Sequence, residues 1–259
     1  MKFYRIGLAE MLLRLGGIND VSTIDWYGNV SMGIFLAGCN LRCKYCQNSG
    51  LLPFDSGKEV GLELIRGRIK VNRAIMDAVV IMGGEPLVQP DATIEVARIA
   101  RSYGLKVMLN TNGSIRSAAE KVLASGFIDR LALDVVAPLR IEAYEAVTGA
   151  RNPEIIESVK FCLLESKSLG IPLEARTTVA PELTDDPEAI KEIASYLKGY
   201  SEVYYLQQYD NQGEVLDQNL KQKQPPSREK MMTLAHAALS TGLRNVFVKT
   251  RTNGLEKVG

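Results

Sequence analysis

The sequence contains little histidine, little cysteine and no long apolar run. Of its 259 residues, four are cysteines and one is a histidine, His236. A disulfide-stabilised secreted scaffold has more cysteines in a shorter chain, so that class is excluded. The longest uncharged stretch, Trp26–Leu41, includes three glycines, whereas a membrane-spanning helix needs roughly 20 mainly apolar residues. The sequence therefore predicts no membrane-spanning segment.

Neither sign of charge is in marked excess. The chain has 31 Lys and Arg residues against 30 Asp and Glu residues, a formal net charge of +1. This balance provides no overall field that would favour nucleic acid or an anionic membrane as a partner. Hydrophobic residues make up 46% of the chain, which is typical of a globular protein with a sizeable core. Length alone allows one large α/β domain or two smaller ones.

Short aliphatic runs recur along the chain and predict β-strands. Most are continuously apolar, as expected of parallel strands that are covered on both faces. Helical patterns separate them, so the alternation predicts βαβ units and an α/β fold closed as a barrel or a partial barrel. The runs are Val30–Leu36, Ala78–Met82, Lys106–Asn110, Arg130–Asp134, Leu173–Thr178 and Val203–Gln207, with Asn245–Thr250 as a candidate seventh.

Capping signals and apolar spacing predict the helices. Asn152-Pro153 and Asp186-Pro187 each combine an N-cap residue with a proline in the first turn. The other predicted helices are Ala92–Tyr103, one with a capping box at Ser117 to Glu120 that ends at Gly126, and one from Ser227 to Gly242. Ile6, Leu8, Met11, Leu12 and Leu15 have the spacing of a short amphipathic helix. The Gln-rich stretch Asp210–Pro226 predicts a loop.

Three of the four cysteines fall within eight residues, as Cys39, Cys43 and Cys46. They follow an apolar run, so we expect them on a loop at the carboxyl end of the first parallel strand, where α/β barrels build their sites. Three thiolates are one short of a structural zinc site, but they suffice for three irons of a cubane cluster whose fourth iron stays open. Spacing alone leaves an iron–sulfur site, a zinc site and a purely structural role open. Cys162 lies on an apolar stripe, which predicts a core position.

The pattern Cys-x3-Cys-x-aromatic-x-Cys, with Tyr45 as the aromatic residue, resembles the signature of radical S-adenosylmethionine (SAM) enzymes. The resemblance implies that Cys39, Cys43 and Cys46 bind a [4Fe–4S] cluster. It also implies that the methionyl amino and carboxylate groups of SAM chelate the open iron, near Tyr45. The implied fold is α/β, a single-domain partial (β/α)6 TIM-type barrel over residues 1–259. Its core would span about residues 20–210, with extensions at 1–19 and 211–259.

A second motif follows the run Ala78–Met82, where Gly83-Gly84-Glu85 leads into a proline. The glycines allow a backbone to approach a ligand closely, and a carboxylate beside them can accept hydrogen bonds from an ammonium group. An ordinary turn with a solvated glutamate is the competing interpretation. Together with the cysteines, the stretch resembles the Gly-Gly-Glu motif that contacts the methionyl amino group in radical SAM enzymes.

Polar residues at the ends of later runs are further candidates for cofactor binding. Asn110 and Thr111 precede an Asn-Gly turn that resembles the Thr-Asn-Gly turn of glycyl radical enzyme activases, in which Asp often fills the position of Asn110. Asp134 resembles the Asp of their Asp-x-Lys-x-Pro motif, but Val136 replaces the lysine. Arg176, in an Arg-Thr-Thr stretch that also resembles these activases, is a candidate for the missing cation.

The resemblance implies reductive cleavage of SAM to a 5′-deoxyadenosyl radical. It is nearest to activating proteins of anaerobic ribonucleotide reductase, so the expected substrate is a glycine of a partner glycyl radical enzyme. A low-potential electron donor is implied as well. Because reduced thiols are expected and no membrane segment is predicted, we expect a cytoplasmic, anaerobic enzyme. The alternatives are a radical SAM enzyme that acts on a peptide, a nucleoside or RNA, and a non-catalytic zinc or electron-carrier protein.

Overall fold

The structure is a computed structural model and describes residues 11–259. These residues form two compact units. Unit 1 comprises the chain up to Asn40, together with Gly50–Thr111 and Ser117–Arg130. Unit 2 comprises Leu41–Ser49, Asn112–Arg116 and Leu131–Gly259. No helix in the described residues is both long enough and apolar enough to cross a bilayer.

Unit 1 contains a mixed sheet with strand order β5-β4-β2-β1-β3. Strands β2, β4 and β5 are parallel, and β1 runs antiparallel to β2 and to β3. Four consecutive residues of β4, Ala78–Ile81, are fully buried, as the continuous apolar run predicts for a strand covered on both faces. The strands are β1 (Leu12–Ser22), β2 (Ser31–Leu36), β3 (Lys58–Gly61), β4 (Ala78–Gly83) and β5 (Lys106–Thr111).

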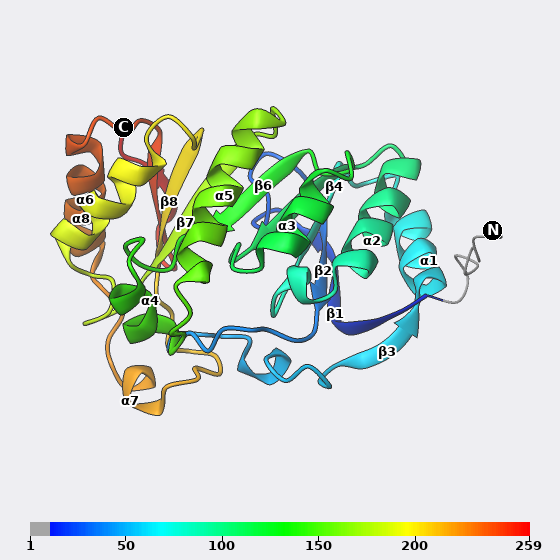
Figure 1. Cartoon of the computed structure of the whole chain (residues 1–259), viewed down its shortest axis with the longest axis horizontal. Helices are drawn as coiled ribbons and strands as arrows, with labels where there is room; N and C mark the ends of the chain where they lie inside the picture. The colour runs from blue at the N-terminus through cyan, green and yellow to red at the C-terminus, as the bar shows by residue number, and fades with distance from the viewer. Residues whose placement is uncertain (1–10) are drawn as a thin grey trace. The chain divides into compact units, whose positions relative to one another are not determined.

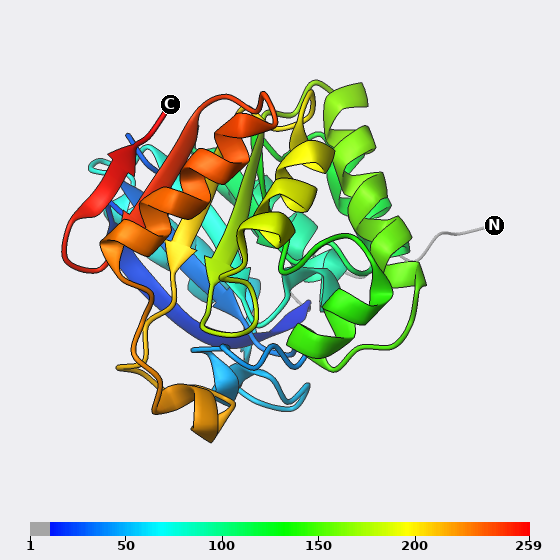
Figure 2. The ribbon, with the colours of Figure 1, turned by 90° about the vertical axis from the view of Figure 1, so that its left-hand side faces the viewer.

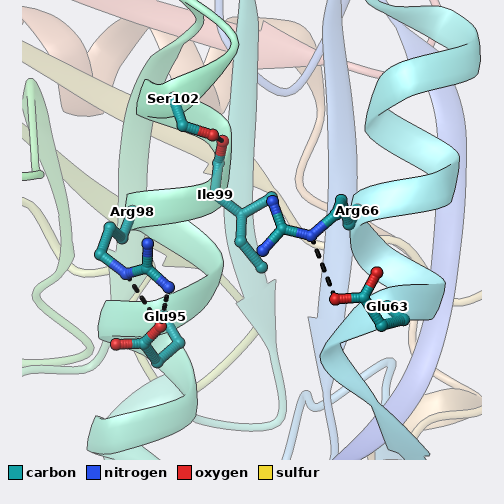
Figure 3. Close-up of polar contacts among 6 residues, drawn as sticks. All are labelled: Glu63, Arg66, Glu95, Arg98, Ile99 and Ser102. Atoms are coloured by element: carbon teal, nitrogen blue, oxygen red, sulfur yellow. Dashed lines mark hydrogen bonds and ion pairs between the residues drawn. The ribbon is translucent and has the colours of Figure 1, made fainter. Parts of the chain in front are cut away.

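Helices α1 and α2 lie side by side in unit 1, and α2 packs on β4 and β5 (Figure 1). Each helix carries an ion pair between residues three apart. Glu63 pairs with Arg66 at 3.2 Å and Glu95 pairs with Arg98 at 2.5 Å (Figure 3). Because these pairs are partly solvated, each contributes only about 0–1 kcal/mol. The helical segments are α1 (Leu62–Asn72), α2 (Pro90–Ser102), α3 (Arg116–Leu123) and the 3-10 turns η1 (Ser49–Leu51) and η2 (Pro86–Val88).

Unit 2 contains a sheet with strand order β10-β9-β8-β7-β6. Strands β6 to β9 are parallel, and β10 pairs antiparallel with β9. Helices α6 and α8 lie next to each other against this sheet (Figure 2). The strands are β6 (Arg130–Asp134), β7 (Leu173–Val179), β8 (Val203–Gln208), β9 (Val246–Thr250) and β10 (Gly254–Lys257); the helices are α4 (Ile141–Thr148), α5 (Glu154–Ser168), α6 (Pro187–Leu197), α7 (Gln218–Lys221) and α8 (Arg228–Ser240).

The two faces of the unit 2 sheet differ in polarity. Along β7, Ala175, Thr177 and Val179 are buried, while the alternate residues Arg176 and Thr178 are partly exposed. Parallel register puts equivalent residues of neighbouring strands on the same face. The partly exposed set, here called the polar face, consists of Asp134, Arg176, Thr178, Tyr205, Gln207, Phe247 and Lys249. A polar, partly solvated sheet face is suited to binding a ligand.

All seven predicted strands are present, and β9 is the seventh. The predicted α/β class is therefore confirmed. The caps predicted for α6 and α8 are also confirmed, since Asp186 accepts a hydrogen bond from Ala189 N–H and Ser227 accepts one from Lys230 N–H. The prediction of a single domain over the whole chain stays a prediction.

Four local predictions were wrong in part. Leu12 and Leu15 belong to strand β1, not to an amphipathic helix; Ile6 and Leu8 lie outside the described residues. Ser117 is inside α3, which begins at Arg116, so it is not an N-cap. The N-cap of α5 is Pro153, one residue later than predicted, and Asn152 Oδ1 accepts from Glu154 N–H. The predicted loop 210–226 contains the one-turn helix α7.

Candidate functional site

The first cysteine is anchored within unit 1. The Gly38 N–H donates to Leu51 O at 2.7 Å, and the Cys39 N–H donates to Leu52 O at 3.1 Å. Gly38 has a φ of +90°, which few residues other than glycine adopt. Cys39 is buried, with 6% of its surface exposed. The backbone that follows β2 is therefore fixed where the cysteine loop begins.

The second and third cysteines belong to unit 2, where the loop is held from two sides. On one side, Arg42 N–H donates to Thr148 O at 3.2 Å and Lys44 N–H donates to Val147 O at 3.0 Å, at the end of α4. On the other side, the segment before α7 donates to Lys44 O and Cys46 O from the N–H groups of Asp217 and Leu216, respectively. The loop also closes a turn, with Cys46 N–H donating to Cys43 O at 2.9 Å.

Tyr45 packs on the segment that follows β8. Its ring contacts a small buried cluster formed by Ala180, Tyr209, Val215 and Leu220. Burial raises the pKa of Tyr45, and the nearby Cys43 and Asp134 raise it further, so the phenol stays neutral. The aromatic residue of the cysteine motif thus fastens the loop to the body of unit 2.

None of the cysteines forms a disulfide. In residues 11–259, no three Cys, His, Asp or Glu side chains are gathered as a preformed metal site. Burial raises the pKa of the Cys46 thiol, while the Asn48 backbone N–H and Arg42 oppose that shift. Such a thiol releases its proton when a metal binds it. Three cysteines outside any disulfide on one anchored loop fit an iron–sulfur cluster in the type and number of donors.

Gly83 and Gly84 pack against the backbone from which the cysteine loop starts. A Cβ on Gly83 would lie 2.3 Å from Leu36 O, and a Cβ on Gly84 would lie 2.3 Å from Gly38 O. The close approach makes two hydrogen bonds, from Gly84 N–H to Leu36 O at 2.9 Å and from Glu85 N–H to Gly38 O at 2.7 Å. The double glycine is therefore required by this backbone contact.

The carboxylate of Glu85 is buried, with 1% of the residue exposed. Its Oε1 accepts from Thr111 Oγ1 at 2.5 Å and from the backbone N–H of Leu87 at 2.9 Å, which caps η2. Two of the predicted cofactor residues are thus joined to each other, at the ends of β4 and β5. Asn110, the residue before Thr111, is partly exposed.

Asp134 and Arg176 are register partners on the polar face of unit 2. Arg176 Nε donates to Glu174 Oε1 at 2.6 Å, and both side chains are largely buried. Burial alone would lower the pKa of Arg176, but Glu174 and Asp134 outweigh it and raise the pKa, so the guanidinium stays charged. The three side chains together carry one net negative charge. Val136, at the position of the lysine in the activase motif, is buried.

Cys162 has the predicted core position. It is fully buried in α5, and its Sγ lies 3.7 Å from Gly113 O. Gly113 has a φ of +66°, and a Cβ there would meet Leu133 at 2.6 Å. The fourth cysteine therefore packs under the turn after β5 and is not part of the cysteine loop.

Known proteins resemble this chain in sequence and in fold. The radical SAM superfamily profile matches residues 34–197. A Methanocaldococcus jannaschii protein described as a glycyl-radical enzyme activating enzyme is 31% identical over 242 residues, 91% of this chain and 95% of the relative. The Escherichia coli pyruvate formate-lyase 1-activating enzyme is 24% identical over 194 residues, 73% of this chain and 77% of that enzyme.

A crystal structure of a radical SAM methyltransferase from Sphaerobacter thermophilus matches with a TM-score of 0.67 at 15% identity, covering 86% of this chain and 67% of that one. This likeness shows the fold, and it confirms the α/β partial (β/α)6 TIM-type barrel predicted from the sequence. The sequence match goes beyond the fold, because the M. jannaschii relative is 31% identical over 91% of this chain. The chain therefore belongs to the radical SAM superfamily and, within it, to the glycyl-radical enzyme activating enzymes.

Proposed function

We propose that the protein binds a [4Fe–4S] cluster through Cys39, Cys43 and Cys46, cleaves SAM reductively, and installs a glycyl radical on a partner such as anaerobic ribonucleotide reductase. When bound, the cluster and SAM supply one-electron cleavage to methionine and a 5′-deoxyadenosyl radical, which abstracts a hydrogen atom from the substrate. The observation that carries this proposal is the anchored loop that holds Cys39, Cys43 and Cys46 in a chain related to activating enzymes.

The residues predicted to bind SAM have properties that suit it. The net negative charge of Asp134, Glu174 and Arg176 attracts a sulfonium and an ammonium group. Gly83 and Gly84 let the end of β4 pack on the backbone where the cysteine loop starts, and Asn110 and Thr111 add polar groups at the end of β5. Tyr45 fixes the loop from which the cluster would be held. We assign all of these residues to cofactor binding.

The polar face is suited to the substrate. It combines the aromatic pair Tyr205 and Phe247, whose ring centroids are 5.5 Å apart, with the hydrogen-bonding groups of Gln207 and Lys249. A glycine in an extended loop offers backbone N–H and C=O groups, which amide and ammonium side chains recognise. The M. jannaschii and E. coli relatives named as activating enzymes support a protein substrate of this kind.

The reaction also implies a cellular setting. Cluster reduction needs an external low-potential electron donor, because iron–sulfur potentials suited to this task lie toward the low end of a range of about −700 to +450 mV. Cysteines outside any disulfide and a cluster with an open iron suit a reducing compartment without oxygen. We therefore assign the protein to the anaerobic cytoplasm.

An electron paramagnetic resonance assay tests the proposed function. The reconstituted protein, reductant and SAM are mixed anaerobically with a candidate glycyl radical enzyme. We expect a glycyl radical signal on the partner and an equal amount of 5′-deoxyadenosine. SAM cleavage without a radical on any glycyl radical enzyme would contradict the activase assignment, and absence of cleavage by a protein loaded with iron would contradict the whole proposal.

Replacing Glu85 with alanine is expected to weaken SAM binding by at least about tenfold, which corresponds to 1.4 kcal/mol. The change removes the carboxylate and leaves Thr111 Oγ1 and Leu87 N–H without their acceptor. Isothermal titration of SAM into the reconstituted protein measures the effect. Thr93→Val is the matched control, because it removes a buried hydrogen bond to the same turn, Thr93 Oγ1 to Pro86 O at 2.9 Å, and keeps the carboxylate of Glu85. Equal affinities of wild type and Glu85→Ala would restrict Glu85 to a structural role.

Val136 favours a second candidate, a radical SAM enzyme that acts on another peptide, a nucleoside or RNA. A buried valine stands where activases usually have a lysine. We propose that Arg176, the register neighbour of Asp134, supplies the cation in its place. The assay above separates the two candidates, because hydrogen abstraction from a small molecule or RNA leaves no radical on a glycyl radical enzyme.

A further inference from the structure

The hydroxyl of Tyr144 has no hydrogen-bond partner. In the part of the chain that the structure describes, it is the one buried side-chain nitrogen or oxygen atom without a partner. Tyr144 lies in α4 and is fully buried. Leaving a buried donor unsatisfied costs about 1–3 kcal/mol, so a buried tyrosine without a partner requires an explanation.

The other fully buried tyrosines of unit 2 satisfy their hydroxyl groups. Tyr204 donates to Thr177 Oγ1 at 2.9 Å, and Tyr209 donates to Leu220 O at 3.0 Å. Phenylalanine would fill the same core volume as Tyr144 without a stranded hydroxyl. The hydroxyl therefore has no structural use in the chain alone.

Tyr144 lies one turn before the end of α4 that binds the cysteine loop. Thr148 and Val147 accept hydrogen bonds from the N–H groups of Arg42 and Lys44, the two neighbours of Cys43. Thr148 Oγ1 in turn donates to the backbone oxygen of Tyr144 at 2.7 Å. The backbone of Cys43 is thus clamped to the last turn of the helix that carries the tyrosine.

The causes of the shifted pKa of Tyr144 agree with a position of its side chain near Cys43. Burial raises the pKa of Tyr144 most, and Cys43 raises it further. The raised pKa keeps the proton on the hydroxyl, so the group can act as a hydrogen-bond donor.

We propose that the Tyr144 hydroxyl donates a hydrogen bond to the sulfur of Cys43 once the iron–sulfur cluster is bound, and thereby raises the reduction potential of the cluster. This inference rests on the proposed binding of the cluster by Cys39, Cys43 and Cys46. Hydrogen bonds to the sulfur atoms tune the potential of such clusters. A donor stabilises the more negative reduced state and so makes reduction easier.

The test compares Tyr144→Phe with Tyr204→Phe in the reconstituted holoprotein. Both variants remove one buried hydroxyl from unit 2, but the Tyr204 hydroxyl already has a partner, Thr177, and Tyr204 lies on β8, not on the helix that binds the cysteine loop. Iron and sulfide are quantified first. The midpoint potential is then measured by redox titration followed by electron paramagnetic resonance, and the Fe–S stretching frequencies are compared in H2O and D2O.

We expect a more negative midpoint potential in Tyr144→Phe. The ratio of reduced to oxidised cluster at a fixed potential should fall by about tenfold, which corresponds to 59 mV for a one-electron couple. The deuterium shift of the Fe–S stretching modes should also be smaller in this variant. Tyr204→Phe should keep the wild-type potential. Before reconstitution, Tyr144→Phe should be at least as stable as wild type, because no hydrogen bond is lost.

Different results separate the failure of this inference from the failure of the proposed function. Wild-type protein that takes up no iron overturns both. Wild-type and Tyr144→Phe proteins with a cluster at the same potential overturn the hydrogen bond alone. A Tyr144→Phe variant that takes up no iron, or that is destabilised before reconstitution, also overturns it, because tuning leaves the ligands and the core intact.

Discussion

Replacing Cys43 with alanine is expected to abolish both cluster assembly and SAM cleavage. Cys43 lies between Arg42 and Lys44, whose N–H groups donate to the end of α4. The backbone is therefore fixed on both sides of this cysteine. Alanine leaves two thiolates, Cys39 and Cys46, which cannot hold three irons of a cubane. Iron and sulfide content, the visible absorption of the cluster and the yield of 5′-deoxyadenosine measure the effect.

Cys162→Ala is the matched control for this experiment. It removes a thiol of the same chain that packs in the core, with Sγ 3.7 Å from Gly113 O. We expect wild-type iron content and a loss of about 1–2 kcal/mol of stability, because a small buried group is deleted. Full cleavage of SAM by Cys43→Ala would refute the assignment of this cysteine as a ligand, and loss of iron from Cys162→Ala would show that the signature does not define the ligand set.

The parallel strands could be predicted from the sequence because a strand buried on both faces has an uninterrupted apolar sequence. Ala78–Ile81 are apolar without interruption, and the structure buries all four. Strand β1 was mistaken for a helix because Leu12 and Leu15 are three apart. The alternation was also present, since Leu13 and Leu15 are buried and the residues beside them are partly or fully exposed. The residues around Leu15 therefore fit both a helical and a strand pattern. The pairing of β1 with β2 and β3 selects the strand.

The candidate site was predictable where chemistry is local and not where it depends on tertiary contacts. The three cysteines and the double glycine form short motifs, so their spacing identifies them. The bond between Glu85 and Thr111 joins residues 26 positions apart, and no pattern in the sequence encodes it. Helix α4 was not predicted at all, and the contact of its last turn with the cysteine loop explains why Tyr144 was missed.

The ion pair between Arg176 and Glu174 is predictable from the sequence. Residues two apart on a strand share a face, so Glu174 is the nearest carboxylate available to the Arg176 guanidinium. The structure forms that pair, and both side chains are largely buried. The positive charge of Arg176 is therefore neutralised by Glu174 on the same strand. Any role of Arg176 toward an anionic group has to be exerted from within this ion pair.

Replacing Gly83 with alanine is expected to destabilise the protein by more than about 3 kcal/mol and to abolish iron binding. The residue has a φ of +132°, and a Cβ would lie 2.3 Å from Leu36 O and 2.5 Å from Leu36 N. Both contacts are with backbone, which cannot rotate away as a side chain can. Leu36 is three residues before Cys39, so its displacement would also move the start of the cysteine loop. Urea denaturation and iron content measure the two effects.

Gly104→Ala separates steric clash from backbone strain in this prediction. Gly104 also has a positive φ, of +79°, but no heavy atom lies within 4 Å of a Cβ built there. A left-handed conformation costs an alanine roughly 1–2 kcal/mol, so we expect a loss of this size and full iron content. A global stability of about 5–15 kcal/mol tolerates that loss. Equal destabilisation by the two substitutions would show that the contact between Gly83 and Leu36 does not constrain the cysteine loop.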